Sequence, residues 1–277
     1  MKRKQIGICA PSTPISREDA DQVIALAART HPDAKLIFSD QCFANAGHFA
    51  GDDHLRCNGF VQMANDPRLD AIWFARGGYG AVRIAEEALI QLEVPANDKL
   101  YMGYSDGGNL LAALYKASIG QQAHGPMPID IKRDNGEKVV ERALNWIVSN
   151  ESESLEPHIK EGDKYAAFNL TTLAMLTGTS QMPDLTDHIV MIEEVSEYLY
   201  SFDRAMFNIT NHLAGVGLKG LRLGQVTGIP ENDRPFGQTE EEITRFWCDR
   251  YQIPYLGRAD IGHDANNHIV PFGNAVT

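Results

Sequence analysis

Cysteine is scarce in this sequence, with four residues in 277, and no two of them form a Cys-x-x-Cys pair. So sparse a set cannot form the disulfide framework of a small secreted protein. Long apolar runs are also lacking, because no stretch reaches the roughly 18 residues that a membrane-spanning helix needs. The basic start, MKRKQIGICAPSTP, has too short an apolar segment for a secretory signal peptide. These features predict a cytoplasmic protein with no membrane partner.

Positive charge is scarce as well, since 25 Lys and Arg residues face 37 Asp and Glu residues, for a formal net charge of -12. Nucleic acids and anionic membrane surfaces select for clusters of Lys and Arg, so neither is expected as the main partner. The hydrophobic content of 43% and the charged content of 22% are ordinary for a folded soluble protein. The length allows one large domain or two of medium size.

Apolar segments of strand length alternate with amphipathic segments of helix length through the first 150 residues. This alternation predicts βαβ units and a mostly parallel sheet, with a ligand site beyond the carboxyl ends of the strands. Three loops rich in glycine or serine are expected at that edge, at 10–12, 76–80 and 104–108. The predicted strands cover 5–10, 34–39, 69–75 and 99–105, and the predicted helices cover 17–30, 55–66, 81–92, 108–117 and 136–148.

The polar, acidic segment 151–164 is the best candidate for a linker. It would separate a first α/β domain, residues 1–150, from a smaller α/β domain, residues 165–277. In the second part, the pattern predicts helices over 168–178, 201–217 and 240–251, and strands over 188–195 and 221–229.

The pentapeptide GYSDG, residues 103–107, lies between a predicted strand and a predicted helix and fits the pattern Gly-x-Ser-x-Gly. Such a serine can be a nucleophile on a sharp turn, with the following helix N-terminus lending positive potential and free N–H groups to an oxyanion. It can equally belong to an ordinary turn in which Ser105 or Asp106 caps the helix. The pentapeptide alone leaves both interpretations open.

A serine nucleophile needs a base and a carboxylate that orients the base. Glu193 and Glu194 end an apolar strand and should point to opposite faces, so at most one of them can face the first domain. His263 follows a glycine in a loop before the final apolar segment. Ser105, Glu193 and His263 are therefore a candidate triad, although Glu193 could belong to a surface ion pair and His263 could cap a loop.

The loop RGGYG, residues 76–80, lacks the Gly-x-Gly-x-x-Gly spacing of a dinucleotide site, and no cofactor is expected. Its small residues suit a close approach of backbone N–H groups to a developing oxyanion. Gly77 or Gly78, together with the amide of Asp106, are the candidate donors. His48 and His54 match no standard spacing of metal ligands, so no metal is expected either.

Five further residues are candidates for substrate contact, each with a structural alternative. Tyr79 can line a pocket or pack, and His124, in the segment HGPM, can form a substrate wall or a turn. A free carboxylate on the substrate would need a cation, for which Arg76, Arg83 and Arg204 are candidates.

Taken together, nine segments resemble the LD-carboxypeptidase family of serine peptidases, whose relatives include the microcin-immunity peptidases. They run in the family's order along nearly the whole chain, and this joint order makes the resemblance specific. The segments are IGICAPS, HFAGDDHLRCNGF, LDAIWFARGGYGAVRI, MGYSDGGNLL, AHGPM, LTGTSQMPDL, IVMIEEVSEYLYSFDR, LRLGQVTG and GHDANNHIVPFG.

The resemblance implies that Ser105 is the nucleophile, His263 the base and Glu193 the acidic residue. It implies a Rossmann-like N-terminal domain and a smaller C-terminal α/β domain, with the active site at their interface. Family members are usually dimers that release the terminal D-alanine of cell-wall tetrapeptides during peptidoglycan recycling in the cytoplasm. The expected protein is therefore a homodimeric serine carboxypeptidase whose substrate is a small muropeptide-like peptide.

The sequence departs from the family pattern in two places. The family's Glu-Asp pair is Glu-Glu here, which retains a carboxylate at each position. A turn that usually contains Gly-Gly-Asn reads YAAFNL at 165–170, with Asn169 kept and bulky Phe168 in place of a glycine. Because this turn is expected on the substrate side of the cleft, Phe168 and Asn169 are candidate substrate contacts.

Two other functions stay open at this point. One is a microcin-immunity peptidase that cleaves an acyl-nucleotide toxin with the same triad. The other is a peptide-binding homologue that has no catalytic activity.

Overall fold

Short strands, with β3 and β4 at the buried centre, form the first of two β-sheets in the computed structural model, which describes residues 3–274. Five strands are parallel and a sixth, at one edge, is antiparallel, in the order β10-β5-β4-β3-β1-β2. The strands are β1 (Lys4–Cys9), β2 (Ala34–Phe38), β3 (Ala71–Phe74), β4 (Leu100–Gly103), β5 (Gln121–His124) and β10 (Val270–Pro271).

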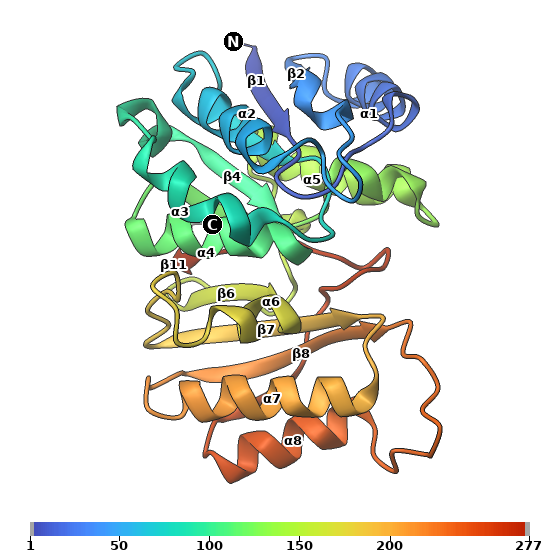
Figure 1. The fold of residues 1–277 in the computed structure, drawn as a ribbon, viewed down its shortest axis with the longest axis vertical. Coiled ribbons are helices and arrows are strands. Elements are labelled where there is room, and N and C mark those ends of the chain that lie inside the picture. Colours follow the sequence, from blue (N-terminus) through green and yellow to red (C-terminus); the bar gives the residue numbers. More distant parts are fainter. Residues whose placement is uncertain (1–2, 275–277) are drawn as a thin grey trace.

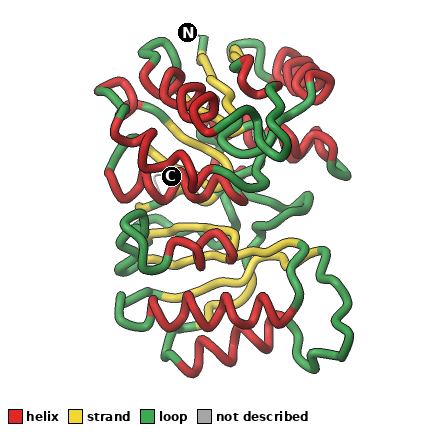
Figure 2. Tube along the Cα trace, viewed as in Figure 1, coloured by secondary structure: helices red, strands yellow, loops and turns green. Residues whose placement is uncertain are grey.

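The side chains of this sheet alternate between its two faces, and each face packs against a different set of helices (Figures 1 and 2). Helices α1 and α5 pack with Ile6 and Trp73 on one face. Helices α2, α3 and α4 pack with Ile72 and Phe74 on the other. The helices are α1 (Arg17–Thr30), α2 (Asp53–Asn65), α3 (Ala81–Ile90), α4 (Gly108–Ala117) and α5 (Gly136–Ser149).

The second sheet has five strands in the order β11-β6-β7-β8-β9, of which only the edge strand β11 is antiparallel within the described residues. One face packs against three helices, and the other buries Ala259, Ile261 and Val270 of the returning chain. The elements are β6 (Lys164–Asn169), α6 (Leu170–Leu176), β7 (His188–Val195), α7 (Leu199–Leu213), β8 (Gly220–Thr227), α8 (Glu240–Arg250), β9 (Tyr255–Arg258) and β11 (Gly273–Asn274).

The predicted α/β class and the mostly parallel sheet are confirmed, and so is the capped start of α1, where the Ser16 side chain accepts a hydrogen bond from the backbone N–H of Asp19. Sequence reasoning missed β5, because QQAH is too polar to read as a buried strand. Five short 3-10 helices also occur in segments that read as loops: η1 (Asp40–Phe43), η2 (Val94–Asp98), η3 (Ser105–Gly107), η4 (Pro128–Lys132) and η5 (Ser152–Ser154).

The predicted turn at 165–170, followed by a helix over 168–178, is wrong. Residues 164–169 form β6, which pairs in parallel with β7 over its whole length, and the helix begins only at Leu170. The segment YAAF is apolar and buried on both faces, which favours a central strand over a turn. Phe168 consequently lies in the core with 1% of its surface exposed, and its ring packs edge-on against that of Phe272.

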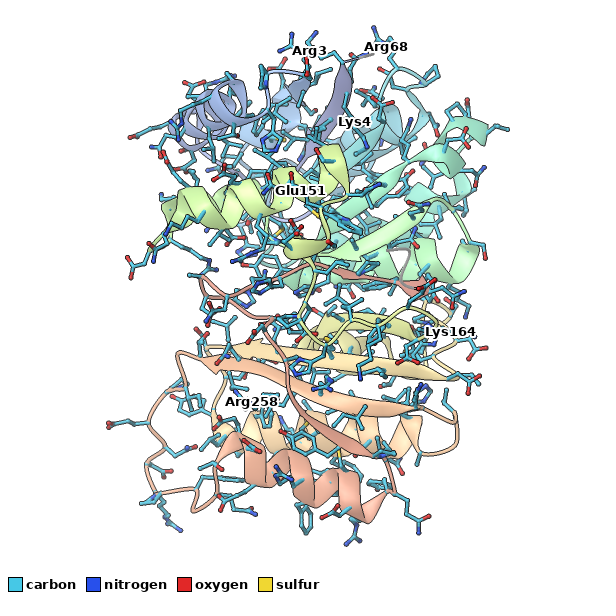
Figure 3. All side chains as sticks on the ribbon, turned by 180° about the vertical axis from the view of Figure 1, so that it is seen from behind. Arg3, Lys4, Arg68, Glu151, Lys164 and Arg258 are labelled. Atoms are coloured by element: carbon cyan, nitrogen blue, oxygen red, sulfur yellow. The ribbon has the colours of Figure 1, made fainter. Side chains whose placement is uncertain are left out.

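The chain passes three times between the two sheets: after α5, between β9 and β10, and between β10 and β11. Figure 3, which labels Glu151 and Lys164, shows the first crossing from behind. Leu155 in this segment forms a β-bridge with Ile269 of the returning chain. The return ends with β10 beside β5 in the first sheet and β11 beside β6 in the second. The limits 1–150, 151–164 and 165–277 stay a prediction for the domains.

One hydrophobic cluster runs without a break from helices α2, α3 and α4 through α6 to helices α7 and α8. The two sheets therefore share a core, which fixes the edge of one against the edge of the other. All four cysteines are buried and unpaired, in line with the absence of a predicted disulfide framework. In the described part of the chain, no helix combines the length and the apolar character that a bilayer crossing requires.

Phe168→Ala should destabilise the protein by about 3–5 kcal/mol, because it leaves a cavity in this shared core. Denaturant unfolding measures the change. Ile90→Ala is the matched control, since Ile90 is 86% exposed and its loss should cost less than about 0.5 kcal/mol. Equal stabilities of the two variants would contradict the assignment of Phe168 to the core.

Candidate active site

Three loops at the carboxyl edge of the first sheet are tied together by hydrogen bonds, as the topology predicts. The buried carboxylate of Asp106 accepts from the Ser12 hydroxyl (2.5 Å) and from the backbone N–H of Ala81 (2.8 Å). The Thr13 hydroxyl donates to the carbonyl of Gly77 (2.5 Å). The loops after β1, β3 and β4 therefore meet at one point. Burial raises the pKa of Asp106, although its three donors oppose that shift.

Ser105 lies on a sharp turn between β4 and α4, with φ at +56°, in the left-handed region that only a few non-glycine residues adopt. Close packing requires a residue without a side chain at both flanking positions, 103 and 107. A Cβ at Gly103 would come within 2.7 Å of the Phe74 ring, and one at Gly107 within 2.9 Å. Ser105 itself makes no side-chain cap to the helix in the described structure. This geometry favours the nucleophile interpretation of GYSDG over the ordinary cap.

The RGGYG loop runs directly against Ser105. A Cβ at Gly77 would lie 2.8 Å from the Ser105 Cβ and 2.9 Å from its Oγ. Gly78 has φ at +108°, which a side chain would strain. Within residues 3–274, no hydrogen bond takes up the backbone N–H of Gly77, Gly78 or Asp106. These N–H groups are therefore available to an oxygen atom beside Ser105.

Glu193 and His263 form a hydrogen bond of 2.7 Å between Oε2 and Nδ1. Glu193 is completely buried near the end of β7, and the His263 side chain is 11% exposed in the loop before β10. Because a carboxylate only accepts, the proton of this bond belongs to Nδ1, which leaves Nε2 as the free ring nitrogen. Burial lowers the pKa of His263, but the charge of Glu193 and its hydrogen bond outweigh burial and raise that pKa above 6.5.

The His263 ring also contacts the sharp turn that bears Ser105, which we call the elbow. Its centroid lies 4.8 Å from that of Tyr104, the residue that precedes Ser105. The ring is thus held between a carboxylate of the second sheet and an aromatic residue of the first.

Glu194 points away from Glu193, as strand alternation predicts, and has its own partners. Its carboxylate accepts from the side-chain amide of Asn169 (2.6 Å) and from the hydroxyl of Thr171 (2.7 Å). Burial raises the pKa of Glu194, and these donors moderate the shift. Asn169 also caps α6, so its amide and carbonyl are both used inside the protein. In the next turn, the Thr172 hydroxyl donates to the Ser105 carbonyl (3.3 Å).

The other candidates for substrate contact fall into two groups, buried and exposed. Phe168 and His124 are buried, and His124 instead hydrogen-bonds to Asn267 (3.0 Å) with its pKa lowered by burial to about 4. Arg76 and Tyr79 are exposed on the RGGYG loop beside Ser105. Neither buried side chain offers a surface to a ligand, whereas both loop residues do.

The two remaining arginine candidates already have protein partners. Arg83 makes a two-pronged ion pair with Asp53 (2.7 and 2.9 Å). Arg204 donates to Ser201 and lies over the Tyr200 ring. Arg76 alone among the three makes only a hydrogen bond to a backbone carbonyl, that of Pro14.

No group of three or more His, Cys, Asp or Glu side chains in the described residues could hold a metal ion. His54 pairs with Asn58 on α2, and His48 packs edge-on against Phe49.

Sequence reasoning missed the residues behind the site, namely Asp130, Arg133 and Asn267. All three contact Tyr104 or the loop that carries His263. Their contacts span up to 143 positions, which no local pattern reports.

The model of the LD-carboxypeptidase N-terminal domain matches residues 6–125, and the model of the LD-carboxypeptidase C-terminal domain matches residues 165–277. The chain belongs to the LD-carboxypeptidase family. Among the curated relatives, two have names that refer to murein peptides. The murein tetrapeptide carboxypeptidase of Pseudomonas aeruginosa is 23% identical, with 82% of this chain and 78% of that protein covered. The probable murein peptide carboxypeptidase of Bacillus subtilis is 26% identical, with 98% and 88% covered.

Solved structures share the fold of this LD-carboxypeptidase family member over almost its whole length. Muramoyltetrapeptide carboxypeptidase from Oxalobacter formigenes superposes with a TM-score of 0.79 at 22% identity, covering 98% of this chain and 93% of the other. The microcin C7 self-immunity protein in complex with aspartyl sulfamoyl adenosine gives a TM-score of 0.78 at 18% identity, covering 99% and 92%. At these identities the similarity concerns the fold.

Gly77→Ala should lower turnover by about a hundredfold while the protein stays folded, because the new Cβ would overlap the space of the Ser105 side chain and displace it. Peptide hydrolysis and thermal unfolding measure the two effects. Gly215→Ala is the control, since a Cβ there meets nothing within 4 Å. Wild-type turnover in a folded Gly77→Ala variant would refute the close contact with Ser105.

Proposed function

We propose that this protein is a serine LD-carboxypeptidase that releases a C-terminal amino acid from a small cell-wall-derived peptide through an acyl-enzyme. The observation that carries the proposal is the buried hydrogen bond between Glu193 and His263, whose ring packs beside the turn that bears Ser105. Membership of the LD-carboxypeptidase family supports the same reaction class.

In the first step, the Ser105 hydroxyl attacks the carbonyl carbon that precedes the C-terminal residue of the peptide. His263 takes the hydroxyl proton at Nε2, because Nδ1 is engaged by Glu193. Glu193 keeps the ring in this orientation and stabilises the imidazolium. Its second oxygen, Oε1, is buried without a partner in the described residues, so the carboxylate directs its hydrogen bonding to His263 alone.

The tetrahedral intermediate needs donors for its oxyanion. The backbone N–H of Asp106 and that of Gly77 or Gly78 are assigned to this role, since they are unused in the described part of the protein and border Ser105. His263 then gives its proton to the departing amine. Water attacks the acyl-enzyme, again with His263 as the base, and restores the Ser105 hydroxyl.

A carboxypeptidase must also recognise the free carboxylate of its substrate. Arg76 is the candidate with an uncommitted guanidinium edge, because its one hydrogen bond goes to the carbonyl of Pro14. Tyr79, on the same loop and 44% exposed, would line the approach to Ser105. The names of the relatives from Pseudomonas aeruginosa and Bacillus subtilis favour a murein-derived peptide as the substrate. A cytoplasmic location and a homodimer belong to the same proposal.

A second candidate is the cleavage of an aminoacyl-nucleotide toxin by the same three residues. The similarity of fold to the microcin C7 self-immunity protein, solved with aspartyl sulfamoyl adenosine, favours including it. The carboxypeptidase remains the better proposal because two curated relatives are named as a murein tetrapeptide carboxypeptidase and a probable murein peptide carboxypeptidase. Parallel assays with an L,D-tetrapeptide and an aminoacyl sulfamoyl adenosine, read by mass spectrometry, distinguish the two.

Ser105→Ala should abolish release of the C-terminal amino acid from an L,D-tetrapeptide, with a loss of more than about a thousandfold, because no hydroxyl remains to form the acyl-enzyme. Mass spectrometry of the released amino acid measures the loss. Ser118→Ala is the control, since Ser118 also has a positive φ but follows α4 at its far end. Persistent turnover by Ser105→Ala would exclude Ser105 as the nucleophile.

The rate of hydrolysis should fall as the pH drops through the raised pKa of His263, so the acid limb of kcat/KM should lie above pH 6.5. Only the neutral ring can accept the serine proton. His124, with its pKa at about 4, is neutral throughout this range and cannot produce the limb. Glu193→Gln removes the negative charge that raises the pKa of His263, so the acid limb of kcat/KM should move to lower pH while the rate falls. An acid limb at the wild-type pH in Glu193→Gln would contradict the role of Glu193 as the group that raises the pKa of His263.

A further inference from the structure

Two arginines from the first half of the chain hold the loop that carries His263. Arg133, which follows η4, donates through Nη1 to the carbonyl of His263 itself (2.6 Å). Arg142, on α5, donates to the carbonyls of Ala265 (3.0 Å) and Asn267 (2.9 Å). The loop is therefore fixed through its backbone by groups that do not belong to the second sheet.

Arg133 uses the rest of its guanidinium on the elbow. Its Nε donates to the carboxylate of Asp130 (2.6 Å), and its Nη2 donates to the Tyr104 hydroxyl (3.1 Å). Tyr104 in turn donates to Asp130 (2.8 Å), whose other oxygen accepts from the backbone N–H of Met127 (2.8 Å). All three nitrogens of the guanidinium thus have protein partners.

The two ends of this network lie at or beside the two partners of the proposed proton transfer, His263 and Ser105. One end is the backbone of His263, and the other is Tyr104, the residue bonded to Ser105. Asp130 is 1% exposed and Tyr104 is 2% exposed, whereas the Arg133 side chain is 32% exposed, so the arginine binds a buried pair from the edge of the core rather than forming a surface ion pair. A planar guanidinium with five donors in fixed directions suits such a three-way contact, and a lysine ammonium does not reproduce it.

We propose that Arg133 is a positioning residue that sets the His263 ring against Ser105 by joining the His263 backbone to the Tyr104–Asp130 pair. This inference rests on the proposed function, because it assigns Arg133 to the same proton transfer. Its hydrogen bonds go to Asp130, the Tyr104 hydroxyl and the His263 carbonyl, none of which is a reacting atom. It acts through His263, which takes the proton, and through Tyr104, which precedes Ser105 in the chain.

The charge of Arg133 also reaches His263. The charged or titratable groups that act on or contact this ring are Glu193 from β7, Arg133 and Asp130 from the region of η4, Tyr104 from the elbow, and His124 from β5. Glu193 and Asp130 raise the pKa of His263, and Arg133 lowers it. Removal of the guanidinium should therefore move the acid limb of the pH profile upward, which a purely structural role would not do.

Two substitutions separate the charge of Arg133 from its geometry. Arg133→Met loses both, so kcat should fall by about a hundredfold with KM within about twofold of wild type, and the acid limb should move to higher pH. Arg133→Lys keeps the positive charge but loses the planar guanidinium with its several N–H donors. For this variant, kcat should fall by about tenfold or more while the acid limb stays near its wild-type position. Added guanidinium at millimolar concentration should partly restore kcat in Arg133→Met.

Arg29→Met is the matched control, because Arg29 forms an exposed ion pair with Glu137 in the first turn of α5 and its loss should leave kcat unchanged. Circular dichroism and thermal unfolding establish that each variant is folded. Kcat within about twofold of wild type in folded Arg133→Met or Arg133→Lys would overturn the inference. So would a loss of kcat in Arg133→Met without any shift of the acid limb.

The outcome for Arg133 is distinguishable from that for the proposed function. If the wild type releases no amino acid from any tetrapeptide, the proposed function fails. The labelling rate of Ser105 by a fluorophosphonate then replaces turnover as the measure of His263-assisted nucleophilicity. Labelling of the Arg133 variants at the wild-type rate would overturn the inference, and labelling slowed by about tenfold or more would support it.

Discussion

The site depends on one buried hydrogen bond, between Glu193 at the end of β7 and His263 in the loop before β10. A carboxylate removed from water is costly unless it is paired, and Glu193 has His263 as its only hydrogen-bond partner in the described structure. The pairing determines which ring nitrogen is free and raises the pKa of the histidine. Because Ser105 lies on the other sheet, the bond can serve a reaction only if the sheets are fixed relative to each other. The shared core and the arginines that hold the His263 loop supply that rigidity.

Close backbone packing is the second constraint. Ser105 keeps a left-handed conformation that costs about 1–3 kcal/mol for a residue with a side chain. The surrounding structure offsets that cost, since Gly103 and Gly107 pack against Phe74 and Gly77 packs against the serine. The same lack of side chains leaves backbone N–H groups near the hydroxyl. Tight packing and the proposed oxyanion hole thus have one physical origin.

The sequence predicts the alternating part of the fold well, because strands such as β3 and helices such as α4 have apolar patterns that few other structures satisfy. It fails at β5, where QQAH is polar, and at β6, where a family turn suggested a loop but YAAF is buried on both faces. The elbow could be anticipated from GYSDG, and the meeting of three loops followed from parallel topology. The pairing of Glu193 with His263 could not follow from spacing alone. The contacts of Arg133 lie beyond local patterns, since they join residues 130 positions apart.

The most direct test of this account is proton NMR of the His263 Nδ1–H. A buried imidazole N–H that donates to a carboxylate should give a resonance far downfield that exchanges slowly with water. The account predicts this resonance in the wild type and in Ser105→Ala, and its loss in Glu193→Ala and in His263→Gln. A folded Glu193→Ala protein that keeps the resonance, or a wild type that lacks it, would contradict the central claim that Glu193 orients His263.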